Sequence, residues 1–509
     1  MSSSDPEKYS IDEMMEKLQN RTSEDPNQDG ELVTRADGSQ AVRVRKRKRR
    51  SQQAHKEALN HNRRSKIIQV TISLVALLLV LFACGIAIIY ANSAPFRKSL
   101  VQKISLLTGA NADLRQFRVT PTRANAELLT LTWPEGNALR ELSLRRTSAE
   151  ISPSTFLGKS MRGEDVSLQE VTLGLRHPEV GKPTRISAPD PKNHALLSFK
   201  FYSTPKLRVL FGEPTMPFAR MENVEATFQP ENTKGIPQLL LNRGEITLQG
   251  WPKFKLERSH IEFRGDEVDV VGMRLRHDGD NVGALELSGT LLPYSPDRAS
   301  LFAIQLQAFP IAGIVGPELG RFFPGHIDTL SSAKSNFLSV KPGPSPDSTL
   351  VISYTSSVTA PFEITNFPFL LGLGQILDDK WFERPIFNSD VTGNLRRIGG
   401  TITLSDINFT DKGRLAIRGN LTMTSDKKLS GILEIGVAES MIGSAKIPKF
   451  ASMFSAAEGG FRWLPIKISG TATTPADNFR ELFEAASIKS EPAKTESSVP
   501  SFEDLTAPK

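Results

Sequence analysis

The longest run of apolar positions covers residues 67 to 91, IIQVTISLVALLLVLFACGIAIIYA, and contains no charged side chain. At a rise of 1.5 Å per residue, a helix of this length measures roughly 37 Å, enough to cross a bilayer with some tilt. The alternative is a secretory signal peptide cleaved after Ser93. The apolar stretch of a signal peptide is normally shorter than this one, and a long hydrophilic segment does not normally precede a signal peptide. The pattern therefore favours a transmembrane anchor.

Beyond the anchor, the pattern changes to short stretches in which apolar and polar residues alternate, separated by Gly, Pro, Asn and Asp. Residues 125 to 137, 164 to 175 and 259 to 280 are examples. Alternation places successive side chains on opposite faces of a strand, so each strand has one apolar and one polar face. The sequence therefore predicts a mainly β fold: one N-terminal transmembrane helix followed by an elongated, twisted antiparallel β-sheet groove with a few short helices.

An internal repeat supports the elongated sheet. GALELSGTL (283 to 291) and GRLAIRGNL (413 to 421) align without a gap; GEITLQG (244 to 250) is a shorter copy, and IKISGTA (466 to 472) and DVTGNL (390 to 395) keep the ending. We expect the closing glycine to bend the strand or admit a bulge, and the repeated units to lie side by side. Their shared apolar face comprises Ile246, Leu248, Leu285, Leu287, Leu291, Leu415, Ile417 and Leu421.

Short helices are expected at five places, the last of them at FRELFEAASI (479 to 488). After the anchor, Pro95 opens a helical pattern that Gly109 stops, and this helix can lie at the membrane surface. Glycine-punctuated apolar segments follow at 309 to 323, 367 to 382 and 437 to 454. The middle segment has more large apolar side chains than one packed face needs, so it either covers an open part of the sheet or contacts lipid. As cap candidates it supplies Phe367, Phe369, Leu370, Leu373 and Ile376.

Charge gives the anchor a direction. Residues 41 to 66 carry 11 Lys or Arg against one acid, and residues 1 to 40 carry four bases against ten acids. The basic flank places the N-terminus in the cytoplasm and the residues beyond the anchor outside it. The run RVRKRKRR (43 to 50) also has the composition of a nuclear-import or nucleic-acid patch, but topology and anionic headgroups explain it more economically. We therefore expect no nucleic-acid partner.

The expected division of the chain follows from these segments. Residues 1 to 66 form a disordered cytoplasmic tail, 67 to 91 the anchor, 92 to 480 the exported β-rich region and 481 to 509 a disordered end rich in Pro, Ser, Glu and Lys. Within the tail, Ser10 and Glu13 make a capping box before apolar residues at helical spacing. This segment is either a docking helix or a transient one.

The residues that carry chemistry are sparse. One cysteine, Cys84 within the anchor, excludes a disulfide framework and a cysteine-based metal site. The chain has 7 His, none of them paired at metal-ligand spacing, and nucleotide-binding, zinc-protease, serine-hydrolase and calcium-loop motifs are missing. We therefore expect no cofactor, no metal and no enzymatic activity.

Taken together, these segments resemble the AsmA-like proteins of the Gram-negative envelope. The resemblance covers roughly residues 67 to 480. It rests on the single span, FRVTPTRANAELLTL (117 to 131), SPSTFLGKSMRGEDVSLQEVTL (152 to 173), the repeated strands and LPIKISGTATTPADNF (464 to 479). It implies an inner-membrane protein with its bulk in the periplasm, a role in outer-membrane biogenesis, and phospholipid held in an apolar β groove. Two departures are the long cytoplasmic tail and the short exported region.

Two functions remain open. In the first, the apolar faces bind or transport phospholipid; in the second, the helical segments plug them and the protein is an envelope assembly or regulatory scaffold that acts through other envelope proteins. The first is favoured. At one strand per 12 to 15 residues, roughly 24 to 30 strands at about 4.8 Å each give at most about 115 to 145 Å of ladder. A periplasm on the order of twice that width would then require a partner, a membrane approach or a shuttle role.

Overall fold

The computed structural model describes residues 31–34, 36–38, 40–43, 51–152, 161–177, 197–231, 235–265, 267–295, 297–330, 336–341, 347–358, 360–445 and 447–489. Expected features at residues 1–30 and 490–509, including the capping box and most of the C-terminal end, lie outside these ranges. The chain divides into two units, Met1–Ala83 and Cys84–Lys509.

The first unit holds a hairpin and most of a long helix. Strands β1 (Glu31–Thr34) and β2 (Gln40–Arg43) pair antiparallel, and helix α2 runs over Ser51–Ala91. Its segment Val70–Ala91 is long and apolar enough to cross a membrane, with a mean hydropathy of 3.0. The structure thus has regular elements within residues 31–66, where the sequence predicts a disordered tail. The helix begins ahead of the uncharged segment because no Gly or Pro interrupts residues 51–84.

The second unit begins with the last residues of α2 and with helix α3 (Ala94–Thr108). The Ser93 hydroxyl caps α3 by accepting the Phe96 N–H, Pro95 lies in its first turn, and Gly109 ends it with φ 66°. The prediction for this helix is therefore confirmed. Ile104 packs with Leu131 and Trp133 of the adjacent sheet, and the Trp133 indole N–H donates to the Thr108 carbonyl at 2.8 Å. Contacts with the sheet thus fix α3 in place.

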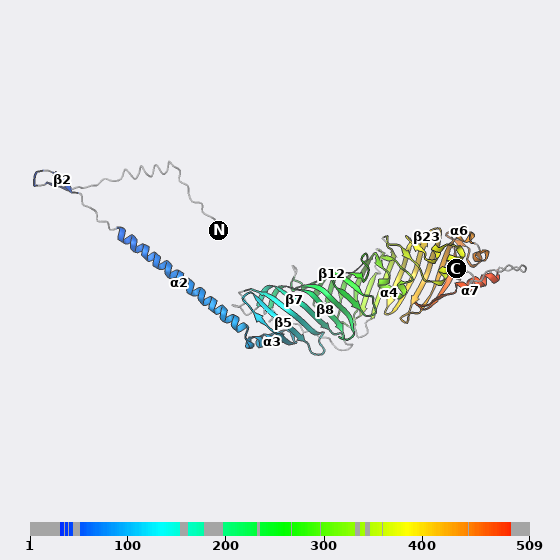
Figure 1. The fold of residues 1–509 in the computed structure, drawn as a ribbon, viewed down its shortest axis with the longest axis horizontal. Helices are drawn as coiled ribbons and strands as arrows, with labels where there is room; N and C mark the ends of the chain where they lie inside the picture. Colours follow the sequence, from blue (N-terminus) through cyan, green and yellow to red (C-terminus); the bar gives the residue numbers. More distant parts are fainter. Residues whose placement is uncertain are drawn as a thin grey trace. The chain divides into compact units, whose positions relative to one another are not determined.

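The sheet is a ladder in which most strands pair with their neighbours along the chain (Figure 1). It starts with β3 (Asn111–Arg115) and β4 (Arg118–Val119), which both pair with β5 (Arg123–Thr132). All pairs are antiparallel except β7 with β8, whose connection spans residues 176–196. The sheet continues through β6 (Leu139–Ile151), β7 (Met161–Leu175), β8 (Leu197–Gly212), β9 (Pro217–Gln229), β10 (Gln238–Asn242), β11 (Glu245–Leu248), β12 (Phe254–Arg264), β13 (Glu267–His277), β14 (Ala284–Leu291) and β15 (Ser300–Gln307).

The second half of the ladder follows the same rule. Its strands are β16 (Phe309–Pro310), β17 (His326–Thr329), β18 (Phe337–Lys341), β19 (Asp347–Ser356), β22 (Val391–Ile398), β23 (Thr401–Asp411), β24 (Leu415–Met423), β25 (Leu429–Ala438), β26 (Ala457–Glu458), β27 (Phe461–Gly470) and β28 (Pro475–Asp477). Since β10 and β11 both pair with β9 and β12, they are two halves of one interrupted strand. Among the described strands none joins β28 to β3, so the ladder has two ends. The sheet is mixed rather than purely antiparallel, but the mainly β architecture is confirmed.

The repeat has a structural counterpart. Gly289 of β14 and Gly419 of β24 have φ of 156° and 135°. A Cβ at either would lie 2.2 Å from a carbonyl oxygen of the next strand, Leu301 in one case and Ile432 in the other. Opposite each glycine, the preceding strand has a register shift. The repeat therefore needs glycine to pass a bulge and approach the next strand closely, as expected.

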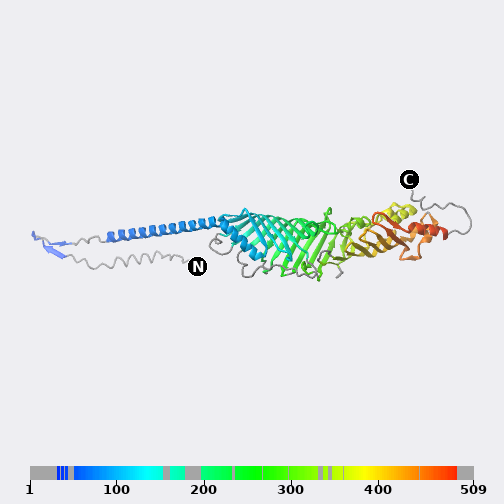
Figure 2. The same cartoon turned by 90° about the horizontal axis from the view of Figure 1, so that it is seen from below.

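Helical segments interrupt the second half of the ladder where the sequence predicts them. The α-helices are α4 (Ala312–Gly320), α5 (Pro368–Leu377), α6 (Glu439–Gly443) and α7 (Phe479–Lys489). The same region also contains two short 3-10 helices, η3 (Lys380–Glu383) and η4 (Pro448–Met453), and a hairpin formed by β20 (Phe362–Glu363) and β21 (Ile386–Phe387). In Figure 2 the yellow and red helical segments lie among the strands of the C-terminal half.

Candidate binding face of the sheet

One face of the ladder is apolar over many strands. The register places Leu144 of β6 opposite Val171 of β7, Val171 beside Leu207 of β8, and Leu207 opposite Val224 of β9. On later strands, Leu256 of β12 lies opposite Leu275, Leu275 opposite Leu285, and Leu285 opposite Leu306. Because residues directly opposite share a face, these side chains form one continuous apolar surface.

From β6 to β14, this surface keeps partly exposed side chains on every strand; we call it the uncovered part. A central row that includes Leu207, Val224, Leu241 and Leu275 is buried. Rows beside it are partly exposed, among them Leu142, Leu144, Val171, Leu173, Val209, Met221, Phe228, Leu239, Ile261, Phe263, Met273 and Leu287. Helices α4 to α7 make their main contacts with the described strands at β16, β25 and β28, which lie beyond the uncovered part. The uncovered part therefore keeps apolar area available for a ligand.

From β19 to β27, the same face is fully packed; we call it the covered part. Phe409 of β23 contacts the rings of Phe323, Phe362 and Phe387, which come from the segment after α4 and from the β20–β21 hairpin. On this face, Phe409 of β23 and Leu415 and Leu421 of β24 are each 0% exposed, and Ile417 is 1% exposed. The covered part is therefore an ordinary closed core.

The predicted groove residues divide between the two parts. Leu285 and Leu287 of β14 and Ile246 and Leu248 of β11 lie on the apolar face of the uncovered part, with Leu287 and Leu248 partly exposed. Leu291, on the same face, is also partly exposed. The equivalent positions of the second repeat copy, Leu415, Ile417 and Leu421, are buried in the covered part. Identical alternation thus leads to two different environments.

The predicted cap residues all belong to the covered part. Phe367, Phe369, Leu370, Leu373 and Ile376 are each 2% exposed or less. Phe367 stacks on Phe322 at 4.7 Å between ring centroids and contacts Phe369 at 5.6 Å. Leu371, on the other side of α5, is 45% exposed. The segment therefore fills the core with one face and presents Leu371 outward.

A row of aromatic side chains runs along the uncovered part and was not singled out in the sequence. Tyr202 of β8 contacts Phe199 at 6.1 Å and Phe228 of β9 at 6.0 Å, and Phe228 contacts Phe263 of β12 at 6.2 Å between ring centroids. Burial raises the pKa of the Tyr202 hydroxyl above its ordinary value of 10.0. Alternation in FKFY (199 to 202) would group Phe199 with Phe201 rather than with Tyr202, so the local pattern does not reveal this row.

A buried arginine links distant strands across the apolar face. Arg397 of β22 is 5% exposed, and its guanidinium stacks on Trp251 at 4.0 Å. It donates to the Ile314 carbonyl of α4 at 2.6 Å and to the Gly250 carbonyl. Desolvation lowers its pKa to about 10. The contact holds β22 and α4 against the turn between β11 and β12.

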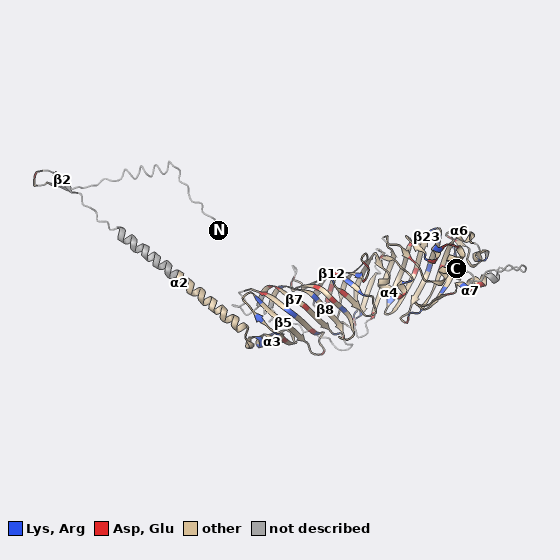
Figure 3. Ribbon diagram, viewed as in Figure 1, with Lys and Arg blue, Asp and Glu red and all other residues tan. Residues whose placement is uncertain are grey.

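The opposite face carries rows of ion pairs, and Figure 3 shows the two charge types interleaved along β7, β8 and β12. Glu170 of β7 lies 3.1 Å from Lys206 and 3.4 Å from Arg145. The hydrogen bond from Lys206 holds the pKa of Glu170 below its ordinary value. Arg274 of β13 bridges Glu257 at 2.7 Å and Glu286 at 2.5 Å. This face therefore suits water, and many of its charged side chains pair within the protein.

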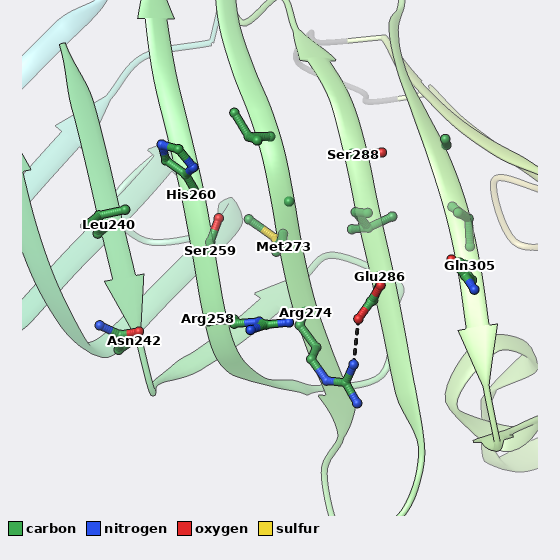
Figure 4. A pocket seen from close by; sticks show the side chains of 15 residues that line it. Leu240, Asn242, Arg258, Ser259, His260, Met273, Arg274, Glu286, Ser288 and Gln305 are labelled. Carbon is green, nitrogen blue, oxygen red and sulfur yellow. Dashed lines mark hydrogen bonds and ion pairs between the residues drawn. The ribbon is translucent and has the colours of Figure 1, made fainter. Parts of the chain in front are cut away.

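A depression of about 640 Å³ lies on the polar face over β10 to β15 (Figure 4). Asn242, Arg258, His260, Arg274 and Gln305 line it. Arg274 is held by its two glutamates, and His260 accepts or donates one hydrogen bond with Gln238 at 3.2 Å. Arg274 and His260 are thus held by protein partners, and the depression is a weaker candidate for function than the apolar face.

No group of three or more His, Cys, Asp or Glu that could hold a metal ion occurs within the described residues. Comparison of the chain with models of known protein families and with curated proteins finds no match in either. The interpretation of the site therefore rests on its own geometry and on the resemblance described above.

Proposed function

We propose that the protein is a single-pass inner-membrane protein whose periplasmic sheet binds acyl chains of phospholipid on the uncovered part, in support of outer-membrane biogenesis. The observation that carries this proposal is the row of partly exposed apolar side chains on strands β6 to β14, which lies on the face opposite the ion pairs. A closed core would bury such rows, as the covered part does.

The energetics agree with an acyl-chain ligand. Each methylene moved from water to an apolar surface contributes roughly 0.8 kcal/mol, so ten methylenes contribute about 8 kcal/mol before the cost of ordering the chain. The aromatic row of Tyr202, Phe228 and Phe263 supplies flat apolar contacts for such a chain. No polar group of the ligand is needed for this contact, so acyl chains of different headgroup classes can bind.

The length of the ladder limits the mechanism. Long strands such as β7, with 15 residues, and β8, with 16, use more chain per strand than the sequence predicts. About 19 strand positions between β3 and β28 at about 4.8 Å give roughly 90 Å, and the uncovered part is shorter still. Transport across a periplasm would therefore need a partner, and local binding or handover is the simpler role.

The alternative is an envelope assembly or regulatory scaffold that carries no lipid. The covered part favours it, because Phe369, Phe387 and Phe409 fill the space that an acyl chain would occupy there. The two functions differ in whether lipid contacts the sheet at all.

Photo-crosslinking of the full chain in cells separates them. A photoreactive residue at Leu173, on the apolar face of β7, is expected to label phospholipid, whereas the same residue at Thr172, on the polar face, is the matched control. Mass spectrometry of the adducts identifies the lipid. Equal labelling at both positions, or labelling of protein alone, would favour the scaffold.

A further inference from the structure

The junction between α2 and the sheet is held by a set of short contacts. The Asn92 side-chain amide donates to the Val119 carbonyl at 2.8 Å, and its oxygen accepts the Val119 N–H at 2.8 Å. Tyr90 contacts Phe96 at 5.6 Å between ring centroids, and Phe96 stacks on Phe117 at 6.4 Å. Only Asn92 and Ser93 separate the end of α2 from α3. If α2 spans a membrane to Ala91, α3 lies at its surface.

Helix α3 contains no acidic residue. Its buried face is formed by Phe96, Leu100 and Ile104, which contact the sheet. The face turned away from the sheet exposes Lys98, Gln102, Lys103 and Leu106. Leu106 is 82% exposed. A basic helix with an exposed leucine has the composition of a helix that lies in a membrane interface.

Three cations at this junction have no anionic partner among the described residues. Within the described part of the chain, Lys98, Lys103 of α3 and Arg118 of β4 have no carboxylate within ion-pair distance, and Arg97 has a buried Nε without a hydrogen-bond partner. Nearby Arg115 and Arg123, by contrast, pair with Asp113 at 2.8 Å and Glu150 at 3.3 Å. The exposed cations of α3 and Arg118, which follow the end of the span, are therefore free to bind an external anion.

We propose that α3 and Arg118 bind the anionic phospholipid headgroups of the membrane in which α2 is anchored, with Leu106 inserted at the headgroup boundary. The inference rests on the anchor in the proposed function but not on acyl-chain binding by the sheet. Anionic headgroups complement the unpaired cations, and two connecting residues bring the helix to them. The contact would hold the first edge of the sheet at a fixed height on the bilayer.

The first test measures the depth of Leu106 in the full chain. A spin label is attached to Leu106→Cys in a Cys84→Ser background, and the protein is placed in nanodiscs of phosphatidylcholine alone or of equal parts phosphatidylcholine and phosphatidylglycerol. We expect collisions with oxygen to exceed those with a nickel chelate, more so in the mixed nanodiscs. A label at Leu301→Cys, on an exposed position of β15, should remain open to nickel in both.

The second test measures headgroup preference. In mixed nanodiscs, phosphatidylglycerol that remains bound to the full chain should fall several-fold in the variant Lys98→Glu/Lys103→Glu/Arg118→Glu. The control Lys341→Glu/Lys380→Glu/Arg396→Glu makes the same charge change at exposed positions far along the chain and should leave it unchanged. Circular dichroism checks that both variants fold.

The outcomes separate this inference from the anchor itself. A label at Val80→Cys reports whether the span is inserted. If Val80 is inserted but Leu106 stays open to nickel, or the charge-reversed variant keeps its phosphatidylglycerol, the inference is overturned. If Val80 itself is open to nickel, the anchor and the proposed function both fail.

Discussion

The carboxylate of Asp477 in β28 accepts the backbone N–H of Phe369 in α5 at 2.7 Å, across 108 residues of chain. Its other oxygen accepts the N–H of Phe479 at 3.0 Å. One side chain at the end of the ladder therefore caps the first turns of both α5 and α7, the two helices that close the covered part.

Removal of this cap should destabilise the covered part. Asp477→Ala leaves two helix N–H groups without an acceptor, which is expected to cost about 1 to 3 kcal/mol in the free energy of unfolding. Urea denaturation of the full chain measures the cost, and hydrogen exchange should quicken at Phe369. Asp426→Ala, which removes an exposed carboxylate paired with Lys428 at 2.7 Å, is the control and should change neither measurement.

The same residue predicts a pH dependence. Burial raises the pKa of Asp477 above its ordinary 3.8, against the lowering effect of the hydrogen bonds from Phe479 and Phe369. The folded state therefore keeps this proton to a higher pH than the unfolded chain does. This preference for the protonated carboxyl adds to the free energy of unfolding. The added stability is fully present below pH 3.8 and is lost as the pH rises through the raised pKa of Asp477.

In Asp477→Asn this contribution is absent. As the pH rises from 3.8 through the raised pKa, the unfolding free energy of the wild type should therefore fall relative to that of Asp477→Asn. Urea titrations at a series of pH values measure it, and parallel pH profiles would contradict the prediction.

Equivalent repeat positions should respond differently to a charge. Ile417→Asp places a carboxylate in the covered core, so we expect a loss of several kcal/mol and unfolding. Leu287→Asp lies at a partly exposed position, so the fold should survive while lipid labelling at Leu173 is lost. Thermal unfolding and photo-crosslinking test both, with Ser288→Asp on the polar face as the neutral control. An unfolded Leu287→Asp would mean that this face, too, is a closed core.

A photo-crosslinker on α5 distinguishes a fixed plug from an opening cap. Phe369 and Leu373 are fully buried, so a crosslinker there captures lipid or a membrane partner only if α5 moves away, as a gating cap would. Leu371 is exposed and should capture such a partner without any movement. Labelling of the protein's own strands at Phe369 and Leu373, with unfolding when residues 367–382 are deleted, would make α5 a structural plug.

Orientation is tested on spheroplasts. The 11-to-1 excess of basic residues over 41–66 predicts that this flank lies in the cytoplasm. Added protease should digest residues beyond the anchor and leave a small N-terminal fragment. Survival of the whole chain would overturn the orientation.

The features that the sequence predicts correctly depend on neighbours along the chain. Pro95 and Gly109 bound α3 because the cap and the left-handed end involve adjacent backbone. Gly289 and Gly419 mark equivalent bulges because each repeat meets only the strands beside it. Alternation over four or more residues was likewise enough to find β7, β14 and β24.

The division of the apolar face could not be predicted from the strands. Leu287 and Ile417 occupy equivalent positions of the two repeat copies. Only the strands around Ile417 are covered, by Phe323, Phe362 and Phe387, which lie outside the repeat. The hydrogen bond from Arg397 to the Gly250 carbonyl joins segments 147 residues apart, and a lone arginine in an alternating strand gives no sign of it. Contacts that depend on how the sheet curves have no local pattern.

The parallel pairing of β7 with β8 also affects the order of assembly. Most antiparallel strands can pair with the one made just before them, so the loops to be closed are short and the ladder can grow from its first strand as the chain emerges. At β7 this growth stops, because β8 reaches its parallel partner only after residues 176–196 have been released. Folding of the ladder therefore has a built-in delay at β8, as it has where helical segments separate β19 from β22 and β25 from β27. The strands before β8 must persist as a short sheet until the connection is complete.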